Sequence, residues 1–375
     1  MKEHKYLYQK MLNEVNIRKA YKKLRKGKTK RKEIRYIDEH LDEEVFKMKM
    51  MIANTRPGEV ECPDLAFKPI IHKPRFIREG GKDRRIYMPE IHEQWLHHII
   101  ILVLEPIVLG TAHPNSCGSY PRRGPHYGKR RIEKWIRSKR GISYYMKIDI
   151  RHFYDNISYK ILFRELRNRI KDEWMLYVIQ KCLGQFKKGL PLGFYISQWL
   201  SNFILEPVDK MIAKISNKNM RYMDDIVVFD SSVFTLRTLL NKISRMLGYR
   251  FYLRVKGNYQ VIKFDDRRGC GRPLDFMGFV FFRNKTIMRK SIMLKATSLA
   301  KKIRKILDCG YRIYRKWISG LLSYNGWFKH TDSYNCYLRH IKPYVRIGHL
   351  KQIISSMDRK EQYDRMERNK IFAAA

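Results

Sequence analysis

Acidic residues are scarce in this sequence. Among 375 residues, 36 Asp and Glu stand against 79 Lys and Arg, which gives a formal net charge of +43. Long apolar stretches are missing as well: the longest, Ile99–Leu104, is far below the ~20 residues that a membrane-spanning helix needs. The first residues lack the apolar segment of a secretory signal. These gaps argue against a membrane-spanning or secreted protein.

Cysteines are few and lie far apart, and none forms a C-x-x-C pair, which disfavours a zinc ribbon. With no export signal in view, we expect reduced thiols and a cytoplasmic protein. Apolar residues make up 44% of the chain, enough for sizeable cores and against intrinsic disorder. The large positive charge needs a polyanion or an anionic membrane surface to neutralise it, and we favour a nucleic acid over a membrane.

Local patterns divide the chain into segments. Residues 1–60 are interpreted as a basic helical extension whose cations are predicted to contact nucleic-acid phosphates: Lys22, Lys23, Arg25 and Lys26. Strands are expected at Phe67–Ile71 and Arg84–Pro89, around a turn at Gly80 and Gly81. Further expected elements are helices at Ser158–Cys182 and Ser197–Ile215, a hairpin at Met220–Phe229, a strand at Leu274–Phe282, and helices from Ser291 onward.

Three aspartates stand out because their neighbours are apolar. Asp149 ends the strand-like run Tyr144–Ile150, and Asp224 and Asp225 interrupt Tyr222–Val228. Carboxylates buried in this way are costly unless a proton or a cation compensates them. Mg²⁺ is a hard ion that takes carboxylate oxygens and substrate phosphates, so the pattern favours a magnesium site for phosphoryl chemistry.

The sequence resembles a bacterial reverse transcriptase across most of the palm and fingers. The tetrapeptide Tyr222–Asp225 matches the family's catalytic hairpin, and Asp149–Ile157 matches the strand that supplies the remaining metal ligand. The resemblance implies an α+β, right-hand polymerase fold with fingers, a palm of antiparallel sheet and helices, and a helical thumb. The implied bounds are 1–60 for the basic extension, 61–143 for the fingers, 144–282 for the palm, with fingers–palm motifs near 189–202, and 283–375 for the thumb and C-terminal region.

The same resemblance assigns a catalytic set. Asp149, Asp224 and Asp225 are implied to hold two Mg²⁺ ions, or Mn²⁺, together with the backbone of Ile150. Lys256 is implied as the general acid that protonates pyrophosphate, although a plain surface lysine is an equally good interpretation.

Other residues are implied to bind the nucleotide. Tyr154, five residues after Asp149, stands where the family places an aromatic gate against a ribose 2′-hydroxyl. Leu192 and Gln198 belong to the turn and helix that cradle the nascent pair, and many retroviral and group II intron enzymes carry Gln where Leu192 stands. The triphosphate-binding candidates from the basic hairpin are Lys82, Arg84 and Arg85, with no choice made among them.

Template and duplex contacts are implied for Arg122 and Arg123 in the fingers and for Lys301 and Lys305 in the thumb. The whole pattern is similar to the stand-alone defence-associated (unknown-group, class 2-like) branch and to diversity-generating retroelements, since both carry an apolar residue at Leu192. We favour an enzyme that copies a structured noncoding RNA template into cDNA from dNTPs in antiphage defence. Error-prone diversification is the alternative, and a group II intron maturase or a non-catalytic RNA scaffold is less favoured. The priming group and the oligomeric state stay open.

Overall fold

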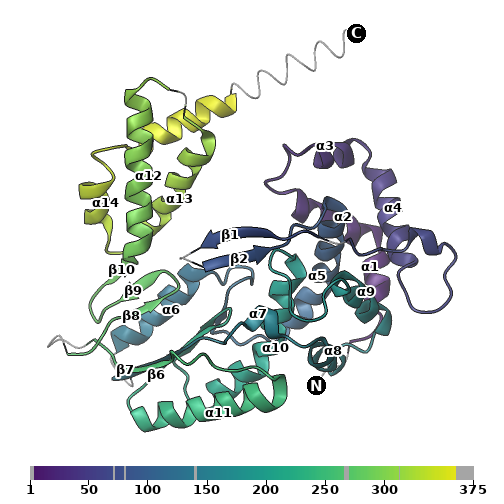
Figure 1. The fold of residues 1–375 in the computed structure, drawn as a ribbon, viewed down its shortest axis with the longest axis horizontal. Helices are drawn as coiled ribbons and strands as arrows, with labels where there is room; N and C mark the ends of the chain where they lie inside the picture. The colour runs from purple at the N-terminus through teal and green to yellow at the C-terminus, as the bar shows by residue number, and fades with distance from the viewer. Residues whose placement is uncertain are drawn as a thin grey trace. The chain divides into compact units, whose positions relative to one another are not determined.

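The structure is a computed structural model that describes residues 4–70, 72–79, 82–138, 142–265, 270–311 and 313–359. The chain divides into two compact units, Met1–Gly124 with Met146–Val261, and Pro125–Tyr145 with Ile262–Ala375. Each unit combines helices with strands, which confirms the α+β expectation (Figure 1). The four domain bounds drawn from the resemblance stay a prediction.

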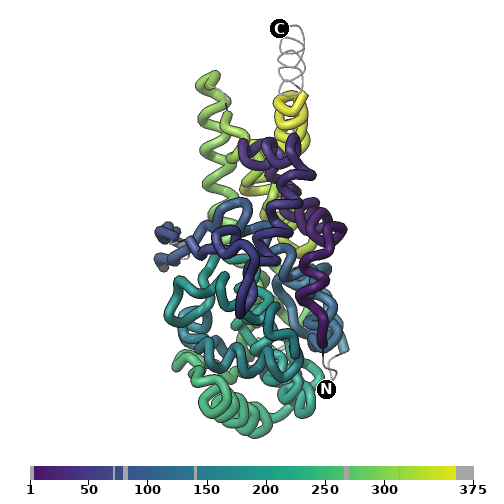
Figure 2. The backbone as a smooth tube through the Cα atoms, turned by 90° about the vertical axis from the view of Figure 1, so that its right-hand side faces the viewer, coloured from purple at the N-terminus to yellow at the C-terminus, as the bar shows by residue number. Residues whose placement is uncertain are grey.

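Four helices at the start of the first unit confirm the helical interpretation of residues 1–60. They are α1 (Leu7–Leu12), α2 (Glu14–Arg25), α3 (Lys32–Glu39) and α4 (Leu41–Ala53). The Asn13 side chain caps α2 by accepting hydrogen bonds from the backbone N–H groups of Val15 and Asn16. The helices contact one another, and their purple trace is continuous in Figure 2.

The long helix α5 (Ile91–Thr111) is the core helix of the first unit. It packs against α1, α2, α9 (Glu173–Leu183) and α10 (Tyr195–Ala213), and more than half of its side chains are buried. Among the described residues it alone is long and apolar enough to cross a membrane, a property that buried core helices share.

The basic hairpin forms, but its first strand lies later than predicted. Strand β1 (Arg75–Glu79) pairs antiparallel with β2 (Lys82–Ile86), whereas residues 67–70 have no regular structure. The expected strand at Phe67–Ile71 is therefore wrong, because Pro69 lacks a backbone N–H for a ladder and Phe67 donates its own N–H to the hydroxyl of Thr55. Ile71, Gly80 and Gly81 lie outside the described residues. The hairpin stands out from the rest of its unit in Figure 2.

A five-stranded sheet carries the predicted aspartates. Its order is β3 (Ser116–Cys117), β5 (Asn219–Tyr222), β6 (Asp225–Asp230), β4 (Tyr144–Ile148) and β7 (Gln260–Lys263). Strands β5 and β6 are antiparallel, which confirms the hairpin predicted at Met220–Phe229, and β3 runs parallel to β5. Helix α10 contacts β5, and α11 (Val233–Phe251) contacts β6.

The helix predicted at Ser158–Cys182 is two helices, α8 (Tyr159–Arg167) and α9. The chain breaks between them because Asp172 caps α9 and the backbone of Lys171 pairs with that of His4. The prediction at Ser197–Ile215 is confirmed within two residues by α10. A short helix, α7 (Phe153–Asn156), follows Asp149.

The second unit contains α6 (Pro125–Ser138), a three-stranded antiparallel sheet and the C-terminal helices. The strand predicted at Leu274–Phe282 is instead two strands, β8 (Leu274–Phe276) and β9 (Phe279–Phe281), because Met277 and Gly278 turn the chain with positive φ angles. Strand β10 (Thr286–Met288) pairs with β9. The helices expected after Ser291 are confirmed as α12 (Lys290–Asp308), α13 (Arg315–Lys329), α14 (Tyr334–His340) and residues 347–359.

The turn at residues 189–193 contacts the chain just after the basic hairpin β1–β2. The backbone N–H of Tyr87, just after β2, donates to the carbonyl of Leu192 at 2.8 Å. Gly193 has φ +103°, and a Cβ atom there would lie 2.0 Å from the Tyr87 carbonyl oxygen. Only glycine satisfies both constraints, so this position fixes where the hairpin emerges.

We expect Gly193→Ala to lower the free energy of unfolding by about 2–4 kcal/mol, because Ala combines backbone strain with a clash against backbone. Gly248→Ala is the matched control: nothing lies within 4 Å of its added Cβ, and a helical Ala should stabilise the chain by roughly 0.5–1 kcal/mol. Urea denaturation of both variants checks this, and equal effects would contradict it.

Candidate active site

The aspartate pair sits at the turn of the β5–β6 hairpin. Tyr222 pairs with Asp225, so Met223 and Asp224 form a two-residue connection. Met223 has φ +59°, a left-handed conformation that costs a non-glycine residue roughly 1–2 kcal/mol. The Met223 N–H donates to the Cys117 carbonyl at 3.2 Å, and a Cβ on Gly118 would lie 2.7 Å from the Met223 sulfur. Strand β3 and the residue after it therefore hold the strained turn in place.

A buried arginine next to the turn supplies a second support. Arg221 is 2% exposed, and its five N–H donors are all used. Nε and Nη2 donate to the two carboxylate oxygens of Asp209, each at 2.7 Å. The remaining three go to Asn202 Oδ1, the Ser116 hydroxyl and, at 2.8 Å, the carbonyl of Met223. Burial by itself would lower the pKa of this guanidinium, but the Asp209 carboxylate outweighs it and raises the pKa.

Asp149 follows β4 and is held by a short ladder with residues 254–256. The N–H of Lys256 donates to the Asp149 carbonyl, and the N–H of Arg151 donates to the Arg254 carbonyl. These bonds flank Ile150 opposite Val255, so the N–H and carbonyl of Ile150 point away from Val255, toward the β6 side of the strand. The implied backbone ligand thus faces the strand that carries Asp225.

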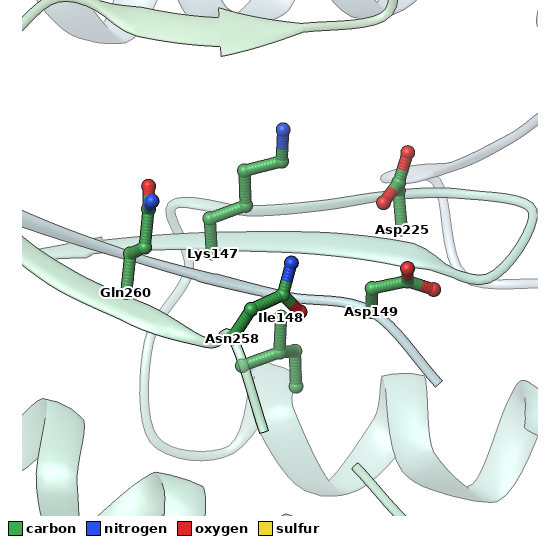
Figure 3. Close-up of a pocket in the computed structure, with 6 residues that line it drawn as sticks. All are labelled: Lys147, Ile148, Asp149, Asp225, Asn258 and Gln260. Atoms are coloured by element: carbon green, nitrogen blue, oxygen red, sulfur yellow. The ribbon is translucent and has the colours of Figure 1, made fainter. Parts of the chain in front are cut away.

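A small pocket of about 130 Å³ brings the two strands' carboxylates together. Asp149 and Asp225 are drawn at one side of it and Gln260 at the other, with Lys147, Ile148 and Asn258 between them (Figure 3). Lys256 forms an ion pair with Asp149, with Nζ 3.1 Å from Oδ2. The structure therefore places Lys256 against a predicted metal ligand, while its role as a general acid stays a prediction.

The negative charges of Asp225 and Asp149 act on the carboxyl group of Asp224. Burial, followed by repulsion from Asp225 and Asp149, raises the pKa of Asp224 to about 6, and the positive charge of Arg84 opposes the rise. A carboxylate cluster of this kind is relieved by a cation, and its hard oxygen donors suit Mg²⁺. Asp149 and Asp225 line one pocket and offer such donors, whereas no group of three or more Asp, Glu, His or Cys side chains in the described ranges is arranged to hold a metal ion.

The predicted nucleotide residues lie around this cluster. Tyr154 is connected to α10 through its hydroxyl, 3.3 Å from the Ser201 hydroxyl, and burial raises the pKa of Tyr154 to about 12. The carbonyl of Tyr154 accepts from the N–H of Leu190, which ties α7 to the 189–193 turn that contains Leu192. Gln198 is exposed, and its amide oxygen accepts from the Ser119 hydroxyl at 2.9 Å.

The structure distinguishes the three hairpin cations. Arg84 is exposed, and its charge acts on both Asp224 and Tyr154. Arg85 follows it in β2, so its side chain leaves the opposite face of the hairpin. The side chain of Lys82 lies outside the described atoms. Arg84 is therefore the hairpin cation that the fold directs toward the aspartates.

The predicted nucleic-acid contacts divide into engaged and exposed groups. Lys23 forms an ion pair with Glu105, and Arg25 pairs with Asp38, while Lys22 and Lys26 are exposed. Arg123 donates to the carbonyl of His113, and its neighbour Arg122 is exposed. Lys301 and Lys305 are exposed on α12 of the second unit.

The sequence patterns did not predict the buried hydrogen-bonded residues that support the β5–β6 hairpin. These residues are Arg221, Asp209, Asn202 and Ser116. One signal was present, since Arg221 is a cation between Met220 and Tyr222 in a segment with the pattern of a strand. Its partner Asp209 lies seven residues after Asn202 on α10, two helical turns along the same face. Only the tertiary structure shows that these side chains meet.

The fold and the site define a class. A mixed helix–sheet unit with adjacent aspartates on a hairpin turn, facing a third aspartate on the neighbouring strand, is typical of template-directed polymerases. Residues 71–255 match the family described as reverse transcriptase (RNA-dependent DNA polymerase). This part of the chain, just under half of its length, is therefore similar to a reverse transcriptase domain.

Curated relatives include bacterial reverse transcriptases. The chain is 24% identical to Protein YkfC of Escherichia coli (strain K12) over 36% of its own length and 39% of the relative's. It is 26% identical to the retron Ec73 reverse transcriptase of Escherichia coli, over 30% of this chain and 42% of the relative. The group II intron-encoded protein LtrA of Lactococcus lactis subsp. cremoris is 26% identical over 38% of this chain and 25% of the relative. The chain thus spans less than half the length of each of these relatives.

Solved structures that resemble this chain include telomerase from Candida albicans in complex with a fragment of telomeric RNA. The TM-score is 0.45 at 11% identity, over 80% of this chain and 61% of that chain. This similarity is too low to carry an argument, so the similarity to reverse transcriptases depends on the match of residues 71–255 to the family.

We expect Arg221→Met to lower the free energy of unfolding by about 3–5 kcal/mol, because it leaves the Asp209 carboxylate buried without its partner. The double variant Arg221→Met/Asp209→Leu should regain most of that loss, since both charges are then gone. Urea denaturation of the two variants checks this. A double variant as unstable as the single one would show that the Asp209 charge is not the source of the cost.

Proposed function

We propose that this chain is an RNA-directed DNA polymerase that copies an RNA template into cDNA from dNTPs. The observation that carries the proposal is that carboxylates from two neighbouring strands, Asp149 and Asp225, line one pocket. Burial and both of these carboxylates raise the pKa of the adjacent Asp224. All three aspartates lie within residues 71–255, which match the reverse transcriptase family. An exclusively scaffolding protein gains nothing from such a repulsive cluster, so its presence favours catalysis over RNA scaffolding.

Side chains around the cluster suit the proposed reaction. The positive charge of Arg84 acts on Asp224, and the planar fork of its guanidinium suits a triphosphate. The Ser201 contact holds the Tyr154 ring in place, which suits the proposed exclusion of a ribose 2′-hydroxyl. Two Mg²⁺ ions, held by the three aspartates and the Ile150 carbonyl, would activate a 3′-hydroxyl and stabilise the leaving pyrophosphate.

We expect the double variant Asp224→Asn/Asp225→Asn to lose primer extension on an RNA template by at least about a thousandfold, because it removes two of the three proposed metal ligands. RNA binding and the free energy of unfolding should not fall, since Asn keeps the side-chain shape and removes carboxylate repulsion. Extension by the unaltered chain should stop with EDTA and return with Mg²⁺.

The matched control is Asp64→Asn, which alters a fully exposed aspartate far along the chain from the hairpin. It should extend the primer at the rate of the unaltered chain. Extension that survives the double substitution, or that resists EDTA, would overturn the proposed chemistry.

We further propose that the template is a dedicated structured noncoding RNA and that the enzyme acts in antiphage defence in the bacterial cytoplasm. The support is the sequence pattern: residues 117–121 and 256–261 resemble the defence-associated branch, and Leu192 replaces the Gln of many retroviral and group II intron enzymes. A diversity-generating retroelement, which shares the apolar residue at Leu192, is the alternative role.

Nucleic acid that copurifies with the protein separates these roles. We expect the unaltered chain and Asp224→Asn/Asp225→Asn to retain one RNA species, and only the unaltered chain to carry its cDNA. Sequencing both fractions checks this. A mismatch-rich cDNA of a repeat beside a variable-protein gene would identify diversification instead, and a mixture of cellular RNAs would contradict a dedicated template.

A further inference from the structure

The second unit contains a hollow of about 600 Å³ beside helix α6. One wall is α6, and the other is the end of α13 with the residues that follow it, 329–332. All nine lining residues have polar or ionisable side chains. An apolar ligand or an apolar partner helix therefore has no surface to bury here, and the hollow suits a charged or strongly polar partner.

Lysines and arginines outnumber the carboxylates that line this hollow, and each carboxylate already has a partner within the protein. Of the two lining carboxylates, Glu133 forms an ion pair with Lys129 at 2.7 Å, and Asp332 accepts the backbone N–H of Thr286 at 2.7 Å. Three exposed cations remain: Arg130, Arg137 and Lys329. Within the described ranges, none of these three forms an ion pair with Asp or Glu.

The two arginines are spaced along one face of the helix. Arg130 and Arg137 are seven residues apart on α6, so they share a face at about 10 Å separation along the axis. Lys329, the last residue of α13, supplies the third charge from the opposite wall. The three cations therefore border the hollow from two elements, which suits an extended anion better than a single small one.

An aromatic cluster fixes the two walls together. The His126 ring, on α6, lies 5.0 Å from the His330 ring, 5.7 Å from Phe279 on β9 and 6.1 Å from Trp327 on α13. Burial, then the charges of His330, Lys129 and Arg130, lower the pKa of His126. The arginines and lysines of the lining carry the permanent positive charge of the hollow.

We propose that this groove binds the phosphate backbone of the template RNA, a contact separate from the aspartate pocket; this inference rests on the proposed function. Four of the nine lining residues are Lys or Arg, and His126, one of the two aromatic rings of the lining, is packed against Phe279 and Trp327, so the lining offers mainly cations, the groups that a phosphate backbone needs. Arginine suits that task because its fork pairs with two phosphate oxygens. Binding through phosphates makes the groove indifferent to base sequence.

The test compares two triple variants of the full chain that lose the same charge. Arg130→Gln/Arg137→Gln/Lys329→Gln alters the groove, and Lys290→Gln/Lys295→Gln/Lys351→Gln alters three exposed cations of the same unit outside it. Fluorescence anisotropy with a labelled 30-nucleotide RNA, across a salt series, gives the affinity and its salt slope for each variant.

Each phosphate contact to a single strand contributes about 0.7 to the slope of log affinity against log salt concentration. Because the groove variant loses three such contacts, we expect its slope to fall by about 2 and its affinity at 0.15 M salt to fall roughly 50-fold. The control should lose less than about threefold. Arg130→Lys/Arg137→Lys should keep the slope, because it keeps the charge. Unchanged unfolding midpoints show that each variant is folded.

Equal losses in the groove and control variants would overturn the proposal, because they would show only the effect of overall charge. An unchanged salt slope for the groove variant would also overturn it, because the proposed contacts are to phosphates. Primer extension at saturating template should stay within about threefold of the unaltered chain. If the unaltered chain fails to extend, the proposed polymerase activity falls, while the salt slopes still decide whether the groove binds RNA.

Discussion

Arg221 is the buried cation on which the geometry of the site depends. Its guanidinium pairs with both carboxylate oxygens of Asp209 and donates to Asn202 and to the carbonyl of Met223. A buried charge is tolerated only when it is fully paired, so these partners are fixed relative to one another. Helix α10 is thereby fastened to the hairpin turn, and the strained backbone of Met223 is kept in the conformation that presents Asp224.

Arg221 and Asp224 are close in sequence but differ in how their charges are balanced. The charge of Arg221 is fully paired within the protein, whereas burial and repulsion from Asp225 and Asp149 raise the pKa of Asp224 to about 6. Compensated charge stabilises a fold, and uncompensated charge awaits a partner. Negative charge is thus concentrated at one point of a chain whose net charge is +43.

Sequence patterns predicted elements well where a local signal was strong. The Asp224–Asp225 hairpin, the helix at α10 and the C-terminal helices were all expected from periodicity and apolar context. Errors arose where tertiary contacts overrode the pattern. Pairing of Lys171 with the distant His4 divided a helix, and the Phe67–Thr55 contact together with Pro69 displaced the first hairpin strand. His4 and Thr55 lie outside the windows in which the two elements were predicted, whereas Pro69 is a local signal against a strand.

The sequence by itself determined the chemistry: three aspartates in apolar runs at family spacing, and an excess of cations that calls for a polyanion. Tertiary structure decided which groups meet. It directed Arg84 rather than Arg85 toward the aspartates, engaged Lys23 in an ion pair with Glu105, and joined Arg221 to Asp209. The physical reason is that composition and spacing fix the kind and number of charges, whereas burial and pairing depend on contacts between elements far apart in the chain.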